Sequence, residues 1–130
     1  MVLSKQRILL VDDSTIICKR LKQLVEESQM GEIAGTCSNG LDAVNMINEL
    51  MPDTVLLDIN LPGTNGFEVL VWLRDSYKHR IKVVIISNHS QAEYRNMALS
   101  LGADYFLDKS TEFNKLSDVL IEISALNITH

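Results

Sequence analysis

The feature that most constrains the fold is an alternation, repeated five times, between short apolar runs and longer segments with apolar residues at helical spacing. The runs fall at 7–11, 32–37, 54–58, 82–87 and 104–107. Two of them, TVLLD and KVVIIS, are apolar almost throughout, as is typical of strands covered on both faces. This alternation predicts an α/β fold, a doubly wound parallel sheet of five strands with five helices. We expect one domain over residues 1–130.

Five apolar stripes mark the expected helices and the side chains expected to face the sheet. They are Ile17, Leu21, Leu24 and Val25; Leu41, Val44, Ile47 and Met51; Phe67, Leu70, Val71 and Leu73; Tyr94, Met97, Ala98 and Leu101; and Phe113, Leu116, Val119, Leu120, Ile123 and Leu126. The sequence SQAE at 90–93 predicts a capping box at the start of the fourth helix.

Composition excludes several classes of protein. The net charge of −5, with acids and bases mixed along the chain, argues against direct nucleic-acid binding, which usually uses a basic face. Cys18 and Cys37 lack metal-ligand spacing, no secretory leader opens the chain, and no apolar run approaches the ~20 residues of a membrane span. We therefore expect a soluble cytoplasmic protein with free thiols and no membrane contact.

Chemically active side chains follow the predicted strands. Asp12 and Asp13 end the first strand, Asp58 the third and Ser87 the fourth, and Lys109 follows the fifth. Ligands of open parallel sheets bind at the carboxyl ends of the strands. We therefore expect these five residues to share one edge.

Three crowded carboxylates would repel one another unless a cation compensated them. Oxygen ligands of this kind select a hard ion such as Mg²⁺. A metal, a lysine and a hydroxyl together are what a phosphoryl group needs. One carboxylate would then be the nucleophile, because aspartate can accept a phosphoryl group covalently.

Four sequence motifs of the chain resemble those of a known family. VDDS (11–14), LLDINLPGTNGFE (56–68), IIS (85–87) and LGADYFLDK (101–109) are similar, in order and spacing, to the motifs of the receiver domain of two-component response regulators. The resemblance covers essentially the whole chain and is nearest in kind to single-domain, chemotaxis-type receivers. It implies a flavodoxin-like sheet with strand order 2-1-3-4-5.

The resemblance also implies roles for individual residues. Asp58 would be the phosphoacceptor, served by a histidine kinase or a histidine phosphotransfer protein. Asp12, Asp13 and Asp58 would hold Mg²⁺, for which Mn²⁺ could substitute, together with the backbone carbonyl of Asn60. Ser87 and Lys109 would bind the phosphoryl group.

Two further positions are implied to regulate the switch. Phe106, three residues before Lys109, corresponds to the family's rotamer switch, although the neighbouring Tyr105 competes for that role. Asn60 and His89 lie where the family tunes the phosphoryl lifetime; the alternative for His89 is an exposed loop histidine without that role. Ser110 replaces a proline that the family often joins by a cis bond. Because a cis bond before serine would cost about 3 to 4 kcal/mol, we expect a trans bond or visible strain.

The expected function is a phosphorylation-dependent switch of a two-component system. Phosphorylation would change the surface of the fourth helix, fifth strand and fifth helix, with a partner protein, a linked output domain or a homodimer as the readout. Met1 and an end just past the fifth helix favour a standalone regulator over a receiver cut from a longer protein. The chain would not be an enzyme beyond its own phosphorylation and dephosphorylation.

Two rival functions have to be weighed. One is a receiver-like interaction domain that works without phosphorylation, but such domains usually lack an acid or the lysine. The other is an aspartate-nucleophile phosphatase, which wants an acid two residues after the nucleophile. That position is Asn60.

Overall fold

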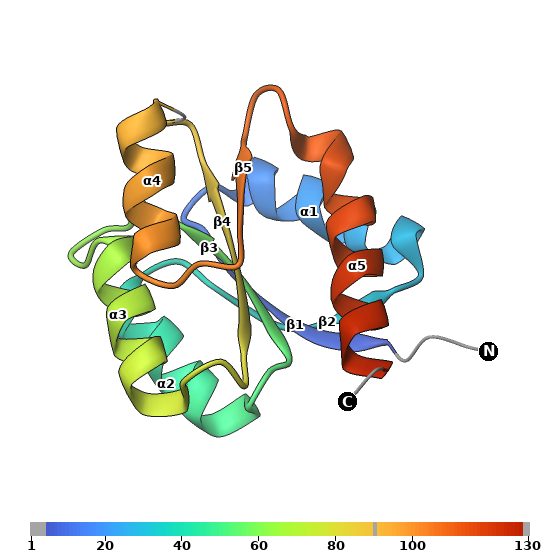
Figure 1. The fold of residues 1–130 in the computed structure, drawn as a ribbon, viewed down its shortest axis with the longest axis horizontal. Helices are drawn as coiled ribbons and strands as arrows, with labels where there is room; N and C mark the ends of the chain where they lie inside the picture. Colours follow the sequence, from blue (N-terminus) through green and yellow to red (C-terminus); the bar gives the residue numbers. More distant parts are fainter. Residues whose placement is uncertain (1–4, 90, 129–130) are drawn as a thin grey trace.

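The fold was obtained as a computed structural model that describes residues 5–89 and 91–128, with side chains described to residue 126. Five strands alternate with five helices (Figure 1). The elements are β1 (Gln6–Val11), α1 (Thr15–Ser28), β2 (Gly31–Cys37), α2 (Gly40–Leu50), β3 (Thr54–Asp58), α3 (Gly66–Tyr77), β4 (Lys82–Ser87), α4 (Ala92–Ser100), β5 (Tyr105–Asp108), the 3₁₀ turn η1 (Phe113–Lys115) and α5 (Leu116–Ile128). The predicted strands are confirmed to within one residue at each end.

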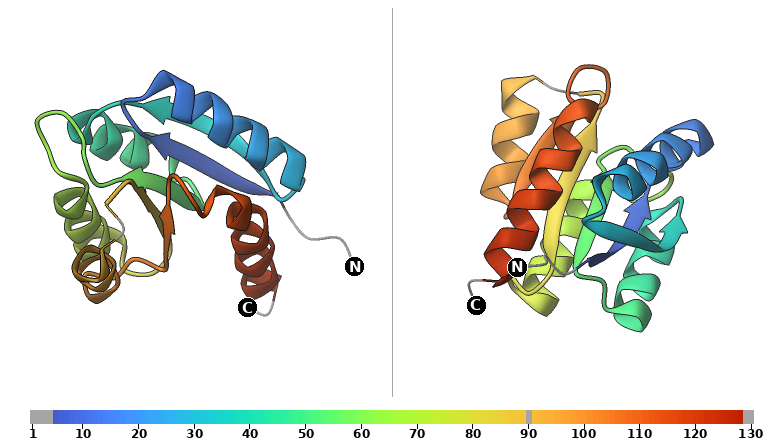
Figure 2. Two further views of the ribbon diagram at one scale, coloured as in Figure 1. Left: turned by 90° about the horizontal axis from the view of Figure 1, so that it is seen from above. Right: turned by 90° about the vertical axis from the view of Figure 1, so that its right-hand side faces the viewer.

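All strand pairs are parallel, in the order β2-β1-β3-β4-β5. The helices α1 and α5 cover one face of the sheet, and α2, α3 and α4 cover the other (Figure 2). The doubly wound sheet with its 2-1-3-4-5 order is therefore confirmed. Among the described residues, no helix is both long and apolar enough to cross a membrane.

The core has two layers, because neighbouring residues of a strand point to opposite faces. Leu9 and Leu57 belong to the layer under α2, α3 and α4, whereas Ile8 and Leu56 belong to the layer under α1 and α5. The near-continuous apolar strands β3 and β4 are thus buried on both faces, as their sequences predicted.

The helix stripes were predicted less well. Several residues expected to face the sheet are instead exposed: Leu41, Met51, Val71, Met97 and Leu126. In α2 and α3, Ala43 and Val69 are buried. A helix on one face of an open sheet buries only a narrow stripe, so the apolar residues beside that stripe face the solvent.

The predicted capping box at 90–93 cannot be placed, because Ser90 lies outside the described residues. The helix α4 begins at Ala92, and the side chain of the preceding Gln91 makes no capping hydrogen bond.

Candidate functional site

The carboxyl ends of the strands gather the polar side chains at one edge of the sheet. Asp58 pairs in register with Ile86, the residue before Ser87, and Ser87 pairs with Asp108, the residue before Lys109. The backbone N–H of Lys109 also donates to the carbonyl of Ser87 over 2.9 Å. The register alone therefore places the ends of β3, β4 and β5 side by side.

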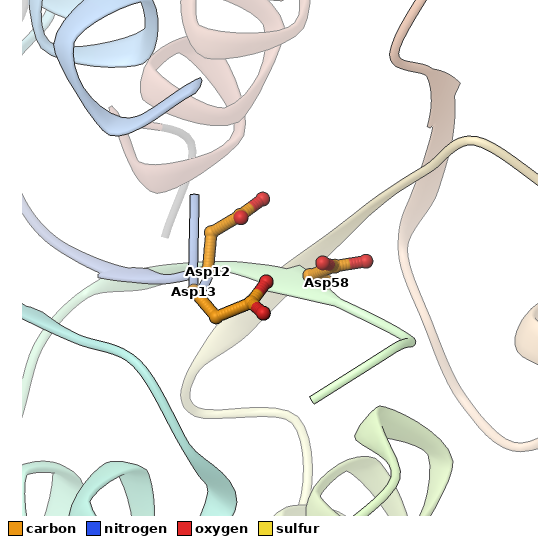
Figure 3. Close-up of side chains that lie close together, drawn as sticks. All are labelled: Asp12, Asp13 and Asp58. Atoms are coloured by element: carbon orange, nitrogen blue, oxygen red, sulfur yellow. The ribbon is translucent and has the colours of Figure 1, made fainter. Parts of the chain in front are cut away.

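Asp12, Asp13 and Asp58 form a compact acidic cluster at this edge (Figure 3). One carboxylate oxygen from each lies within 4.8 Å of the others. Asp12 and Asp58 are each 4% exposed, whereas Asp13 is open to solvent. The cluster thus combines two buried carboxylates with one that solvent or a ligand can reach.

Lys109 joins the two buried carboxylates. Its Nζ lies 2.7 Å from Asp12 Oδ2 and 3.0 Å from Asp58 Oδ2. Burial raises the pKa of Asp58 above its ordinary value, against the opposing hydrogen bond and charge of Lys109. Burial by itself would lower the pKa of Lys109, but its hydrogen bonds to Asp12 and Asp58 raise it overall. The ammonium therefore stays charged across the physiological range.

The charge balance suits a divalent cation. If all three carboxylates were ionised, the single ammonium would leave two negative charges at the edge. The donor set is entirely oxygen, which selects a hard cation, and an open carboxylate such as Asp13 leaves room for water and phosphate ligands. The residues present therefore fit a magnesium ion.

Backbone groups hold the acids in place. Asp12 Oδ1 accepts the N–H of Ser14 over 2.8 Å, and Asp58 Oδ1 accepts the N–H of Asn60 over 3.2 Å. Gly66, the first residue of α3, lies so close to the loop after β3 that a Cβ atom there would be 2.2 Å from the carbonyl oxygen of Asp58. The start of α3 therefore depends on a residue without a side chain.

Ser87 and His89 are linked through the loop after β4. The Ser87 side chain is fully buried, and its Oγ accepts the N–H of His89 over 3.0 Å. The ring of the exposed His89 stacks on Tyr94 of α4, with 5.2 Å between centroids. Through this contact the His89 ring lies against α4. The lifetime-tuning roles of His89 and of the exposed Asn60 stay predictions.

Phe106 and Tyr105 occupy opposite faces of β5. Phe106 is 5% exposed and belongs to the core under α2, α3 and α4. Tyr105 packs on the α1 and α5 side, where burial and a hydrogen bond to Glu122 raise its pKa to about 12. Phe106 thus faces α4, and its switch role stays a prediction.

The loop after β5 is held by side chains where the family often has proline. Asp108 Oδ1 accepts the N–H and the hydroxyl of Ser110, over 2.7 and 2.6 Å, and the N–H of Thr111. No cis peptide bond occurs among the described residues. The expected trans bond between Lys109 and Ser110 is therefore confirmed.

Arg95 and Glu112, which sequence reasoning missed, connect α4 with β5 and the loop after it. Arg95 of α4 lies over the Phe106 ring, 4.7 Å from its centroid, and donates to the Phe106 carbonyl and to Glu112 Oε1, over 3.1 and 2.8 Å. Glu112 Oε1 also accepts the N–H of Asp108. Nothing in the sequence signals this network, because each contact joins different elements through long side chains.

A sequence profile of the response regulator receiver domain matches residues 8–121. The chain belongs to the response regulator receiver family. Receiver domains act as phosphorylation-dependent switches in two-component systems, interact with histidine kinases and output domains, and bind Mg²⁺ at an acidic pocket. A receiver domain is typically not a catalytic enzyme in its own right.

Several relatives carry more than a receiver domain. The nitrate/nitrite response regulator protein NarL of Escherichia coli K12 is 38% identical over 119 residues, which are 91% of this chain and 54% of NarL. A protein-glutamate methylesterase/protein-glutamine glutaminase of Clostridium acetobutylicum is 33% identical over 92% of this chain and 36% of its own length. The chain thus spans about half or less of the length of these relatives.

Solved structures agree with the fold. The signal receiver domain of the putative response regulator NarL from Mycobacterium tuberculosis has a TM-score of 0.84 at 26% identity, covering 94% of this chain and 98% of that one. The response regulator domain of Thermotoga maritima CheB has a TM-score of 0.80 at 27% identity, covering 97% and 98%. The flavodoxin-like receiver fold is therefore confirmed.

Proposed function

We propose that Asp58 of this receiver domain accepts a phosphoryl group from a histidine kinase or a histidine phosphotransfer protein, with Mg²⁺ bound at Asp12, Asp13 and Asp58. The observation that carries the proposal is the gathering of three carboxylates within 4.8 Å of one another, two of which also contact the Lys109 ammonium. An ion pair alone would need one carboxylate, so the surplus of acid is what favours a metal-assisted phosphoryl site.

The chemistry follows from the nucleophile. A carboxylate oxygen of Asp58 attacks the phosphorus atom of a phosphohistidine, the P–O bond forms and the P–N bond breaks. The electron pair of the broken bond, with a solvent proton, goes to the donor imidazole. A bound Mg²⁺ would neutralise charge on the phosphoryl oxygens, and Mn²⁺ could substitute. The backbone carbonyl of Asn60 is the expected fourth protein ligand.

Lys109 and Ser87 are the proposed partners of the product. Lys109 already reaches Asp58, so its ammonium can pair with the phosphoryl group without a large movement. The buried Ser87 hydroxyl accepts the N–H of His89 through a lone pair, and its own O–H can donate to a phosphoryl oxygen. A shift of Ser87 towards that oxygen would carry the hydrogen-bonded backbone of His89 with it and so move the loop after β4, while Asn60 and His89 set how long the phosphoryl group survives.

The output would be a changed surface over α4, β5 and α5. A displaced loop after β4 would change how α4 packs on the sheet. It would also change the packing around Phe106, which is the proposed rotamer switch. Arg95 ties Phe106 to α4, so a movement of either reaches the other. A packed core does not deform continuously but changes between distinct packing arrangements of its side chains, so a small shift at the site can produce a larger change at the surface.

The wider assignment belongs to the same proposal. Residues 1–130 form one receiver domain that acts in the cytoplasm, where Cys18 and Cys37, which are free thiols, stay reduced. The readout is a partner protein, a linked output domain or a homodimer formed on phosphorylation, and this domain makes no direct contact with nucleic acid or membrane. Its own chemistry is limited to phosphorylation and dephosphorylation of itself.

The test is phosphorylation by acetyl phosphate with Mg²⁺, with Mn²⁺ or with a chelator, followed by intact mass. We expect one added phosphoryl group that requires the metal and is lost in Asp58→Asn. The exposed Asp42→Asn is the matched control and keeps the gain. Absence of any added mass in the native chain would contradict the proposal and leave a phosphorylation-independent interaction domain.

A further inference from the structure

The helices α3 and α4 carry an apolar surface that the phosphoryl site does not use. Two adjoining hollows, of about 450 and 190 Å³, share Phe67 as a common wall. Among the described residues, the larger hollow is lined by α3 alone, and the smaller one lies between Phe67 and α4. We call the pair the α3/α4 groove and define it by Phe67, Val71 and Trp72 of α3 and Tyr94 and Met97 of α4. The two helices lie on the same face of the sheet (Figure 2).

The groove has the composition of a binding surface. Val71 is 41% exposed and Met97 50%, although the helical spacing of apolar residues predicted both to be buried. Phe67, Trp72 and Tyr94 are half-buried, since each packs one side against the core. Half-buried Trp and Tyr beside exposed aliphatic side chains are typical of the anchor points of interfaces.

The rim of the groove is acidic. Glu68 and Asp75 line the larger hollow and Glu93 the smaller one. No basic side chain lines either hollow, and none of these three carboxylates has an ion-pair partner within the part of the chain that the structure describes. The rim therefore presents unneutralised negative charge around an apolar floor.

The arginines of these helices do not offset the rim, because the chain uses them itself. Arg74 of α3 forms an ion pair of 2.7 Å with Asp104 and donates to the carbonyls of Gly102 and Ile81. Arg95 of α4 is engaged by Phe106 and Glu112. The arginines of α3 and α4 are thus engaged within the chain, and a partner with basic side chains can supply the charge that matches the rim.

We propose that the α3/α4 groove docks an amphipathic helix of a partner protein, with apolar residues on one side and Lys or Arg on its flanks. Apolar residues spaced i, i+3, i+4 and i+7 would lie on the groove floor, and the basic flanks would meet the acidic rim. A second copy of this chain would bring a second acidic rim against the first, and an anionic bilayer would be repelled by it. The charge pattern thus favours a basic protein segment over both.

The test selects binders without assuming their charge. A displayed library of helical peptides of about 16 residues, roughly four turns, would carry leucine at i, i+3, i+4 and i+7 and any of Lys, Glu, Gln, Ser or Ala elsewhere. It would be selected against the unphosphorylated full chain. We expect the enriched peptides to be rich in lysine and poor in glutamate.

Variants then locate the binding. Val71→Lys and Met97→Lys are expected to weaken the selected peptides about tenfold or more, because each puts a charge on the apolar floor. The matched control is Leu41→Lys, which adds the same charge at an exposed apolar residue of α2 and should leave binding unchanged. Circular dichroism of each variant would show that the fold is kept.

Three results of the peptide experiments would overturn the proposal. They are no enrichment, enrichment of acidic or uncharged peptides, and binding to the Val71→Lys and Met97→Lys chains that is as tight as binding to the native chain. A concentration-dependent dimer that is lost in Val71→Lys would instead assign the groove to a second copy. None of these readouts depends on Asp58, so the groove and the phosphoryl site can fail separately.

Discussion

Lys109 is the residue on which the charge balance of the acidic edge depends. Its ammonium contacts Asp12 and Asp58, and all three side chains are more than nine-tenths buried. Removing one partner from a buried ion pair costs more than the pair contributes, because it leaves charge uncompensated. The fold should therefore tolerate the loss of this lysine poorly when no metal is present.

We predict that Lys109→Met lowers the free energy of unfolding by about 3 kcal/mol in the presence of a chelator, as measured by urea denaturation. Lys115→Met is the matched control. Its ion pair with Glu112 involves an ammonium that is 61% exposed, so its loss should cost about 0.5 kcal/mol or less. Equal costs for the two variants would contradict the idea that burial makes Lys109 critical.

Glu112 gives a prediction about acid stability. The hydrogen bond from Arg95, followed by that from Lys115, lowers its pKa from 4.5 to about 2. A carboxylate whose pKa is lower in the folded chain stabilises the fold above the unfolded pKa and loses that contribution as the pH falls through the folded value. Native and Glu112→Gln chains should therefore differ most in unfolding free energy above about pH 4.5 and converge towards pH 2. A difference that stays constant over this range would refute the linkage.

The start of α3 illustrates how one element positions the site. A Cβ on Gly66 would lie 2.2 Å from the Asp58 carbonyl oxygen and 2.7 Å from the Ile59 Cα, and both are backbone atoms that cannot rotate away. We expect Gly66→Ala to cost about 3 kcal/mol of unfolding free energy and to weaken Mg²⁺ binding by moving Asp58. Calorimetric titration with Mg²⁺ would measure the second effect.

Gly63 is the matched control for this element. It lies in the same loop with a positive φ of 76°, but a Cβ there would meet no atom within 4 Å. Gly63→Ala should cost only about 1 kcal/mol, from backbone strain, and leave Mg²⁺ binding intact. If Gly63→Ala weakened Mg²⁺ binding as much as Gly66→Ala, loop flexibility, rather than the close approach of Gly66 to the backbone of Asp58, would explain both effects.

At the level of elements, the strands were easier to predict than the helix faces. A strand buried on both sides needs apolar residues throughout, so TVLLD and KVVIIS can be recognised without knowing what covers them. The buried stripe of α2 passes instead through Gly40, Ala43 and Ile47. Small residues fit where helix and sheet approach closely, and a count of large apolar residues overlooks them.

For the whole molecule, the site was predictable where the topology alone decides it. Parallel strands end at one edge, so Asp12, Asp58 and Lys109 had to come together once the strands were known. The network of Arg95 and Glu112 was not predictable, because a long side chain reaches a partner only after the elements have packed. The α3/α4 groove was missed for the same reason.

Metal binding should stabilise the chain as a unit. A ligand that binds only the folded state adds RT ln(1 + [L]/Kd), about 1.4 kcal/mol at ten times its dissociation constant. We expect the thermal midpoint to rise with Mg²⁺ and with Mn²⁺, and Asp13→Asn to lose most of that rise, because the substitution removes one of the three proposed carboxylate ligands. Without metal the variant should be about as stable as the native chain, since Asp13 has no ion pair among the described residues. Differential scanning calorimetry would measure the midpoints, and an undiminished rise in the variant would remove Asp13 from the ligand set.

The one tryptophan of the chain lies in the α3/α4 groove. Trp72 is half-buried and meets Tyr77 edge-on, with 5.9 Å between ring centroids. Its emission spectrum therefore samples the polarity of the groove, and light absorbed by the neighbouring tyrosine can be passed to it. Unlabelled protein thus carries an optical probe on α3. A titrant that shifts the Trp72 emission to shorter wavelength excludes water from the groove.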